Sequence, residues 1–120
     1  MIIEIACFTY IVSDMARARA FYEGTLGLKM TMDFRGEWIE YDIGATTFAI
    51  TTMELMHKPG VKGGIVAFEV DDFDKTMAHL KAANVPIVFD GCDTPVCRLA
   101  VIADPDGNDI TIHKRTPNAA

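Results

Sequence analysis

The sequence lacks any apolar run of the roughly 18 residues that a membrane-spanning helix needs. Its first residues, Met1-Ile2-Ile3-Glu4, contain no basic segment followed by an apolar one, so we expect no signal peptide. Cysteine is scarce: the three residues form no CxxC pair, which argues against a disulfide framework and against the common zinc motifs. These absences together predict a cytoplasmic protein with reduced thiols.

Basic residues are fewer than acidic ones, and several enzyme signatures are absent from the sequence. Lys and Arg number 11 against 17 Asp and Glu, and the net charge of -6 argues against nucleic acid or a membrane surface as the partner. The sequence contains no P-loop, no GxGxxG after a strand, no HExxH and no GxSxG. Apolar residues, by contrast, make up half of the 120, which is enough to build the core of one compact domain.

An order of strand, helix and three strands occurs twice along the chain. Each copy starts with an apolar strand followed by an Asp that can cap a helix, Asp14 in the first copy and Asp72 in the second, 58 residues later. The strands are expected at Ile3–Val12, Lys29–Phe34, Glu37–Ile43, Thr46–Met53, Ile65–Val70, Ile87–Asp90, Val96–Ala103 and Asp109–Lys114.

This order predicts an α+β fold in which a single domain is built from two βαβββ repeats. We expect repeat one at 1–53, a linker at 54–64, repeat two at 65–115 and a tail at 116–120. One helix covers one face of each four-stranded sheet, so the other face must meet the second repeat or enclose a cavity.

Alternation of side chains along each strand assigns residues to the two faces. The uniformly apolar set is expected under the helices: Phe8, Tyr10, Val12, Ile39, Tyr41, Ile43, Phe48, Ile50, Val66, Phe68, Val70, Leu99, Val101, Ile110 and Ile112. The opposite set is mixed, and it is typical of a solvent-facing surface or of a ligand pocket, of which we favour the pocket. This mixed set comprises Cys7, Thr9, Ile11, Trp38, Glu40, Asp42, Thr47, Ala49, Thr51, Ile65, Ala67, Glu69, Arg98, Thr111 and His113.

Three segments carry a resemblance to a known family. They are residues 8–15 with the Phe21-Tyr22 and Leu26-Gly27-Leu28 that follow, residues 67–72, and the closing Asp104-Pro105-Asp106-Gly107-Asn108. Together they resemble the vicinal-oxygen-chelate superfamily, which includes glyoxalase I, bleomycin-resistance protein and the extradiol dioxygenases. The resemblance implies a glyoxalase-like half-open barrel with a small-molecule cleft between its βαβββ units, often completed by a second copy of the chain.

The resemblance also implies where a divalent metal would bind. Metal-dependent members use a His, a carboxylate, a second His and a Glu, and the matching positions here are Cys7, Ala49, Ile65 and Thr111. One thiol and one hydroxyl cannot replace the hydration shell of a divalent ion. We therefore expect no metal and no other cofactor, although displaced ligands drawn from Glu40, Glu69 and His113 stay an alternative.

The candidate ligand-binding residues are Trp38, Glu40, Glu69, Arg98, Thr111 and His113. The Trp38 ring can stack on a planar ligand or simply pack, and Arg98 can pair with an anionic group or form a surface ion pair. His113 and Cys7 are the candidate catalytic residues. His113 is an acid, a base or an exposed strand-end residue, and the three cysteines are reactive thiols or small buried side chains.

Three functions remain open at this stage. The favoured one is metal-free binding of a small, partly aromatic molecule, as in bleomycin-resistance proteins. The alternatives are a metal-dependent lyase, isomerase or dioxygenase with displaced ligands, and a metal-free lyase or isomerase that uses His113 or Cys7. In each case the expected partners are a small-molecule ligand and a second copy of the chain, since homodimer formation can cover exposed sheet edges.

Overall fold

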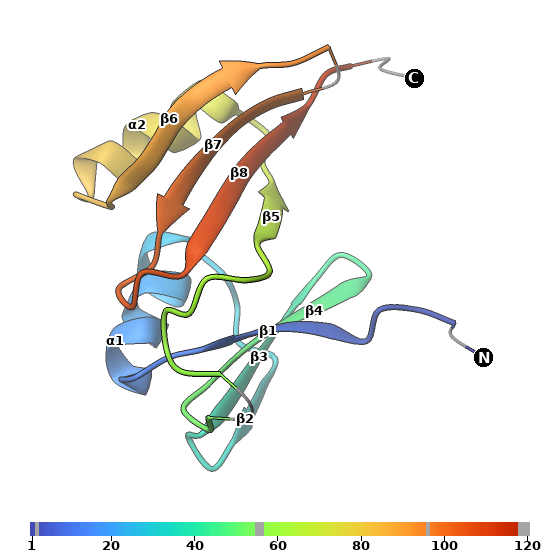
Figure 1. The fold of residues 1–120 in the computed structure, drawn as a ribbon, viewed down its shortest axis with the longest axis vertical. Coiled ribbons are helices and arrows are strands. Elements are labelled where there is room, and N and C mark those ends of the chain that lie inside the picture. Colours follow the sequence, from blue (N-terminus) through green and yellow to red (C-terminus); the bar gives the residue numbers. More distant parts are fainter. Residues whose placement is uncertain (2, 55–56, 96, 118–120) are drawn as a thin grey trace. The chain divides into compact units, whose positions relative to one another are not determined.

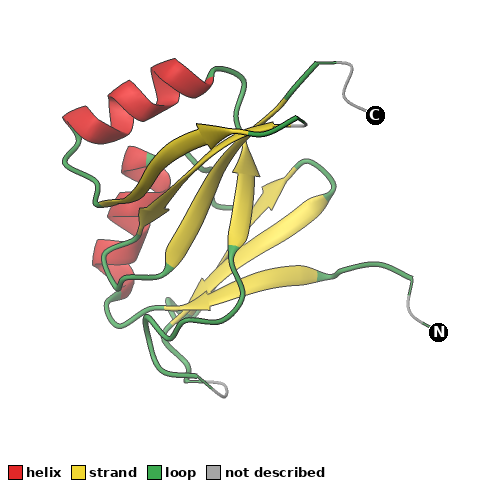
Figure 2. Ribbon diagram, turned by 45° about the horizontal axis from the view of Figure 1, so that its top comes forward, coloured by secondary structure: helices red, strands yellow, loops and turns green. Residues whose placement is uncertain are grey.

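The computed structural model describes residues 1, 3–54, 57–95 and 97–117. The chain divides into two compact units, Met1–Val61 and Lys62–Ala120, each built on one four-stranded mixed sheet with a helical segment (Figures 1 and 2). The predicted α+β class with two βαβββ repeats is confirmed. Of the expected linker and tail, residues 55, 56 and 118–120 lie outside the described residues.

The first unit forms its sheet from strands β1 to β4, in the order β1-β4-β3-β2. Strands β1 and β4 are parallel, whereas β3 is antiparallel to both of its neighbours. The elements are β1 (Cys7–Ile11), α1 (Met15–Arg19), η1 (Ala20–Thr25), β2 (Met32–Phe34), β3 (Trp38–Ile43) and β4 (Thr46–Thr51).

The second unit repeats this topology with the sheet order β5-β8-β7-β6. Here β5 and β8 are the parallel pair, and β7 is antiparallel to β8 and β6. The elements are β5 (Val66–Glu69), α2 (Phe73–Ala82), β6 (Ile87–Asp93), β7 (Cys97–Ala103) and β8 (Asp109–Arg115). Val96, the first residue of one predicted strand, lies outside the described residues.

Both helices begin at the predicted aspartates. Asp14 and Asp72 have extended backbones, and the Oδ1 atom of each accepts a 3.0 Å hydrogen bond from the backbone N–H three residues later. This N-cap satisfies one of the donors that a helix leaves unpaired at its start. The second helix ends at Ala82, and Asn84 then takes a left-handed backbone with φ of 58°, two residues before Pro86.

The first helix differs from the regular helix that its apolar spacing predicts. Its α-helical part is only five residues long and continues as the π-helical segment η1, in which the Leu26 N–H donates to the Phe21 carbonyl at 2.9 Å. Phe21 and Tyr22 lie in this segment and are buried, with their ring centroids 5.0 Å apart. Such segments are rare, and apolar periodicity does not reveal them.

Strand β1 starts four residues later than predicted. It begins at Cys7, whose register partner is Thr47, and β4 itself begins only at Thr46. In the described part of the chain, residues 3–6 belong to no strand, and the side chains of Ile3 and Ile5 are exposed. No helix among the described residues is long and apolar enough to cross a membrane.

The helix-facing sides of the two sheets form the core of each unit. In the first unit, Tyr22, Ile39, Tyr41 and Ile50 are fully buried. In the second, Leu80 of α2 is fully buried, as are Ile102 and Ile110 of the sheet. Burial of such side chains stabilises each fold by about 1.5–3 kcal/mol per residue. Because one side of each sheet is committed to the core, the residues on the opposite side are the candidates for function.

Candidate functional site

The helix-distal face of the first sheet is the side opposite α1 and η1. Strand register places the following residues on it: Cys7, Thr9, Ile11, Met32, Phe34, Trp38, Glu40, Asp42, Thr47, Ala49 and Thr51. The predicted face assignment is confirmed for these strands. Towards the β2 edge the face carries large apolar side chains, of which Phe34 is 50% exposed and Met32 is 42% exposed.

Trp38 and Glu40 form a polar contact on this face. The Trp38 indole Nε1–H donates a 2.8 Å hydrogen bond to Oε2 of Glu40, and both side chains are half-buried. In the register, Trp38 lies opposite Phe34 and Glu40 lies opposite Met32. The contact fixes the indole beside a carboxylate at the partly exposed end of the sheet.

The helix-distal face of the second sheet carries a carboxylate–imidazole pair. Register places Ala67, Glu69, Phe89, Cys92, Leu99, Val101, Thr111 and His113 there. Oε1 of Glu69 lies 2.5 Å from Nδ1 of His113, and Oε2 accepts a 2.7 Å hydrogen bond from the Arg115 backbone N–H. The Arg115 N–H and, secondly, His113 hold the pKa of the Glu69 carboxyl below its usual range. Thr111, the remaining candidate on β8, lies opposite Ala67.

Arg98 does not lie with these residues, and its predicted face is wrong. Its register partner is Lys114, which shares the helix-facing side with Ile112 and Ile110. The guanidinium lies 4.5 Å from the ring centroid of Phe73 on α2, and it also contacts Asp93 and Asp74 at 2.9 and 3.2 Å. The faces predicted for Leu99 and Val101 are also wrong. Both were expected on the helix-facing side, but their register partners, His113 and Thr111, place them on the helix-distal face.

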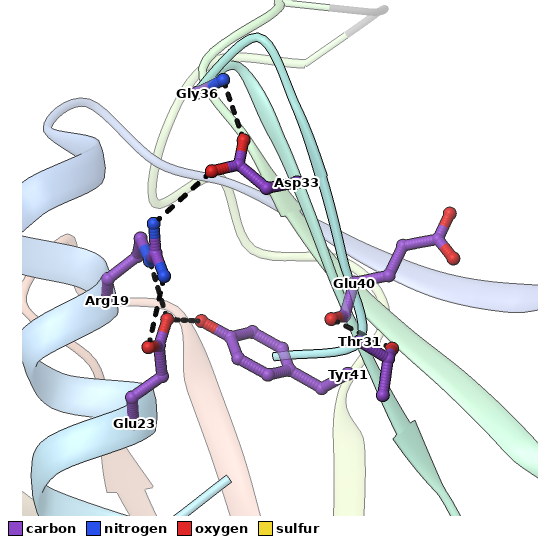
Figure 3. Close-up of polar contacts among 7 residues, drawn as sticks. All are labelled: Arg19, Glu23, Thr31, Asp33, Gly36, Glu40 and Tyr41. Atoms are coloured by element: carbon purple, nitrogen blue, oxygen red, sulfur yellow. Dashed lines mark hydrogen bonds and ion pairs between the residues drawn. The ribbon is translucent and has the colours of Figure 1, made fainter. Parts of the chain in front are cut away.

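Sequence reasoning missed a polar network on the helix side of the first unit. Glu23 of η1 accepts hydrogen bonds from Arg19 at 2.6 Å and from the buried Tyr41 hydroxyl at 2.9 Å (Figure 3). The Arg19 hydrogen bond lowers the pKa of Glu23, and burial together with Glu23 raises the pKa of Tyr41 above its usual range. Arg19 reaches Asp33 as well, at 3.6 Å. The spacing of Arg19 and Glu23, four residues apart, was the one signal in the sequence.

The three cysteines are not alike. Cys97 is buried, as a small apolar residue would be, whereas Cys7 and Cys92 are exposed, so the buried interpretation is wrong for these two. The Cys7 thiol lies 3.7 Å from the Thr9 hydroxyl on the helix-distal face. The Thr9 hydroxyl is not a base that could deprotonate the exposed thiol, so this contact does not activate Cys7 as a nucleophile.

The positions that correspond to the family's metal ligands do not fit a divalent ion. Cys7 is paired with Thr47, and Ala49 is completely buried with a methyl side chain. Ile65 precedes β5 and is 50% exposed, and Thr111 offers a hydroxyl only. Among the described residues, no three His, Cys, Asp or Glu side chains come together in a way that could hold a metal ion.

Comparison with protein families assigns the fold to a known group. The model of the Glyoxalase/Bleomycin resistance protein/Dioxygenase superfamily matches residues 4–112. The chain belongs to this superfamily. Its membership confirms the resemblance seen in the three sequence segments. No curated protein matches the chain.

Solved structures support the superfamily assignment. TnmS3, an antibiotic binding protein from Streptomyces sp. CB03234, is 28% identical with a TM-score of 0.83, over 96% of this chain and 98% of that one. A glyoxalase/bleomycin resistance protein from the same organism is 29% identical with a TM-score of 0.77, over 91% and 98% of the two chains. Lactoylglutathione lyase from Agrobacterium tumefaciens, at 20% identity, a TM-score of 0.76 and 92% of each chain, shares the fold.

Proposed function

We propose that this superfamily member binds a small, partly aromatic molecule and does so without a divalent metal. The observation that carries the proposal is the Trp38–Glu40 pair, a half-buried ring and carboxylate on the helix-distal face of the first sheet. A ligand site needs apolar surface together with a few oriented polar groups, and this pair supplies both. The likeness to TnmS3, whose name describes an antibiotic binding protein, supports the same class of function.

The second sheet offers its own candidate contacts in Glu69, Thr111 and His113. Arg98 is left out of the proposal because it lies on the helix-facing side against Phe73. The absence of a metal is supported by the donor chemistry at Cys7, Ala49 and Thr111, where thiol, methyl and hydroxyl groups stand.

A ligand screen tests the binding function. Compounds that bind the folded state raise its melting temperature, by an amount that grows with the ratio of ligand concentration to Kd. Trp38 is the single tryptophan, so a ligand that stacks on it will change the protein's fluorescence at the site itself. We expect planar heteroaromatic compounds to do both, and Trp38→Leu to weaken their binding at least tenfold. Val61→Ala, at an exposed apolar residue in the same unit, is the matched control and should leave binding unchanged.

Metal analysis tests the second half of the proposal. Protein purified without chelator, and then exposed to Zn²⁺, Mn²⁺, Fe²⁺ and Ni²⁺, should retain less than stoichiometric metal after dialysis. Ligand affinity should be the same with and without chelator. Tight metal at one ion per chain would contradict the proposal and would direct attention to Glu40, Glu69 and His113.

The contact between Glu69 and His113 favours a second candidate function, metal-free acid–base catalysis. A carboxylate at Nδ1 orients an imidazole and leaves Nε2 on the other side of the ring to exchange a proton with a substrate. A base of this kind accelerates deuterium exchange next to the carbonyl group of ketones and hydroxyketones, which NMR detects in D₂O with chelator present. We expect His113→Gln to abolish any such exchange and Cys7→Ser to retain it. Loss in Cys7→Ser alone would transfer the role to the thiol.

Homodimer formation remains part of the proposal. Each sheet ends in two edge strands, β1 and β2 in the first and β5 and β6 in the second. Unpaired edges are commonly covered by a second chain. Light scattering after size-exclusion chromatography should give twice the 13.2 kDa mass of one chain, and a monomer at micromolar concentration would contradict this expectation.

A further inference from the structure

We propose that the molecule bound at Trp38 is a cation, a planar aromatic compound that carries positive charge beside its ring. This inference rests on the proposed binding function and narrows it to one class of ligand. It follows from the position of Glu40 and from the distribution of charge over the helix-distal face of the first sheet.

The Glu40 carboxylate and the Arg19 guanidinium lie on opposite sides of β3 (Figure 3). Figure 3 shows Glu40 on the side of β3 opposite to Tyr41, Glu23 and Arg19. Arg19 is engaged with Glu23 and Asp33 on that other side. Within the described residues, the hydrogen bond to the Glu40 carboxylate comes from the neutral indole of Trp38. In the described part of the chain, the half-buried Glu40 carboxylate forms no ion pair with a basic side chain.

All charged strand residues on this face are acidic. Within the described part of the first sheet, register places Glu40 and Asp42 there and places no Lys or Arg from a strand beside them. The Asp42 carboxylate accepts a 2.8 Å hydrogen bond from the Thr47 hydroxyl, a neutral donor. Arg35, in the turn after β2, lies 5.1 Å from the ring centroid of Phe34, the register partner of Trp38. Among the described residues it forms no ion pair with Glu40.

The chemistry of the pair selects for positive charge. The face of an indole attracts a cation, and the attraction grows when water is excluded. A half-buried carboxylate adds to this attraction and repels an anion placed on the same ring. A neutral aromatic compound would gain the stacking contact alone. The ring therefore determines that the ligand is planar, and Glu40 determines the sign of its charge.

Three acridines with the same ring system and different charge separate these contributions. Aminoacridine is a cation near neutral pH, acridone is neutral, and acridine carboxylate is an anion. Isothermal titration calorimetry at low ionic strength should show the cation binding about tenfold more tightly than acridone. The carboxylate should bind most weakly, and raising the salt concentration should weaken binding of the cation and leave acridone unaffected.

Two variants complete the test. Glu40→Gln keeps the shape of the side chain and its contact with Trp38, so it should bring the affinity of aminoacridine down to that of acridone. Asp33→Asn removes an acid from the neighbouring strand on the helix-facing side and should leave the tenfold preference intact. Should Glu40→Gln fail to fold, the order of affinities in the wild-type protein decides the question alone.

The outcomes separate this inference from the function on which it rests. Binding of acridone or the carboxylate as tightly as the cation, or a preference that survives Glu40→Gln, would overturn the charge selection while leaving aromatic binding in place. Failure of all three acridines to bind, with Trp38 fluorescence unchanged, would overturn both.

Discussion

Nδ1 of His113 lies 2.5 Å from Oε1 of Glu69, which links the parallel strands β8 and β5 on their helix-distal face. The other oxygen of Glu69 accepts the Arg115 backbone N–H at 2.7 Å. One carboxylate therefore fixes both the end of β8 and the orientation of an imidazole. The pair has consequences for stability as well as for any proton transfer.

Replacement of Glu69 by Gln should change how stability depends on pH. The Arg115 and His113 hydrogen bonds lower the pKa of Glu69 in the folded state, so its contribution is present above the ordinary Glu pKa of about 4.3. That contribution is lost as pH falls through the lowered folded-state pKa. Because the side chain is 40% exposed, we expect Glu69→Gln to reduce the free energy of unfolding by only about 0.5–1 kcal/mol near neutral pH.

Urea unfolding at several pH values measures this effect. The difference between wild type and Glu69→Gln should shrink towards zero as the solution is acidified below the folded-state pKa. Glu54→Gln, at an exposed loop carboxylate that contacts Lys58, is the control and should show little difference at any pH. A deficit in Glu69→Gln that is the same at acid and neutral pH would show that the loss comes from packing and not from charge.

Tyr41 should resist ionisation at alkaline pH. Its side chain is fully buried and its hydroxyl donates to Glu23, and both features raise its pKa above the usual value of about 10. The neutral Tyr41 side chain stabilises the folded state fully below about pH 10. This contribution is lost as the pH rises through the folded-state pKa. Ultraviolet titration should therefore include a late phase in which Tyr41 ionises only with unfolding.

Tyr41→Phe is the variant that assigns this behaviour. It should reduce the amplitude of the late phase by one tyrosine and lower the free energy of unfolding by about 1 kcal/mol, the usual net value of one hydrogen bond. The loss remains modest because Glu23 keeps its contact with Arg19. A late phase of unchanged amplitude in Tyr41→Phe would show that Tyr41 does not contribute to it.

The turn before β8 should be sensitive to Asp104. This residue is 2% exposed, and its carboxylate accepts hydrogen bonds from the backbone N–H groups of Asp106 and Asn108 and from the Asn108 side chain, at 2.8–2.9 Å. Asp104→Ala leaves these buried donors unpaired, which costs about 2–4 kcal/mol. Asp104→Asn keeps one acceptor oxygen and should lose less. Thermal melting of both variants measures the order, and equal losses would contradict this account.

Sequence reasoning succeeded where one face of a strand is apolar and the other is polar. Strand β3 alternates Trp38, Ile39, Glu40 and Tyr41, so its core face was assigned correctly from the sequence. It failed on β7, where residues 99–102 are all apolar and alternation holds no information. Pairing with β8 decides that face, and a change of one residue in register reverses it.

The candidate site was predictable to the same extent. Trp38 and Glu40 are two residues apart on one strand, so their common face follows from periodicity alone. The Glu69–His113 contact joins residues 44 apart in the sequence. It depends on the register between β5 and β8, which the sequence alone does not reveal. Tyr41 of β3 joins the Arg19–Glu23 pair, and only the four-residue spacing of Arg19 and Glu23 signals this network in the sequence.

Replacement of Arg98 should change the stability of the protein without changing its affinity for a ligand. Its guanidinium lies over the Phe73 ring of α2 and pairs with Asp93 and Asp74, on the side of the second sheet away from Glu69 and His113. Arg98→Ala should therefore lower the free energy of unfolding by about 0.5–1 kcal/mol and leave the affinity for an aromatic ligand unchanged. Arg98→Lys should recover part of the loss, because a lysine keeps the charge but not the planar stacking. Scanning calorimetry measures the stability of each variant, and titration calorimetry measures its affinity for the ligand that Trp38 binds. A large loss of affinity in Arg98→Ala, with stability unchanged, would contradict the assignment of this residue to the helix-facing side.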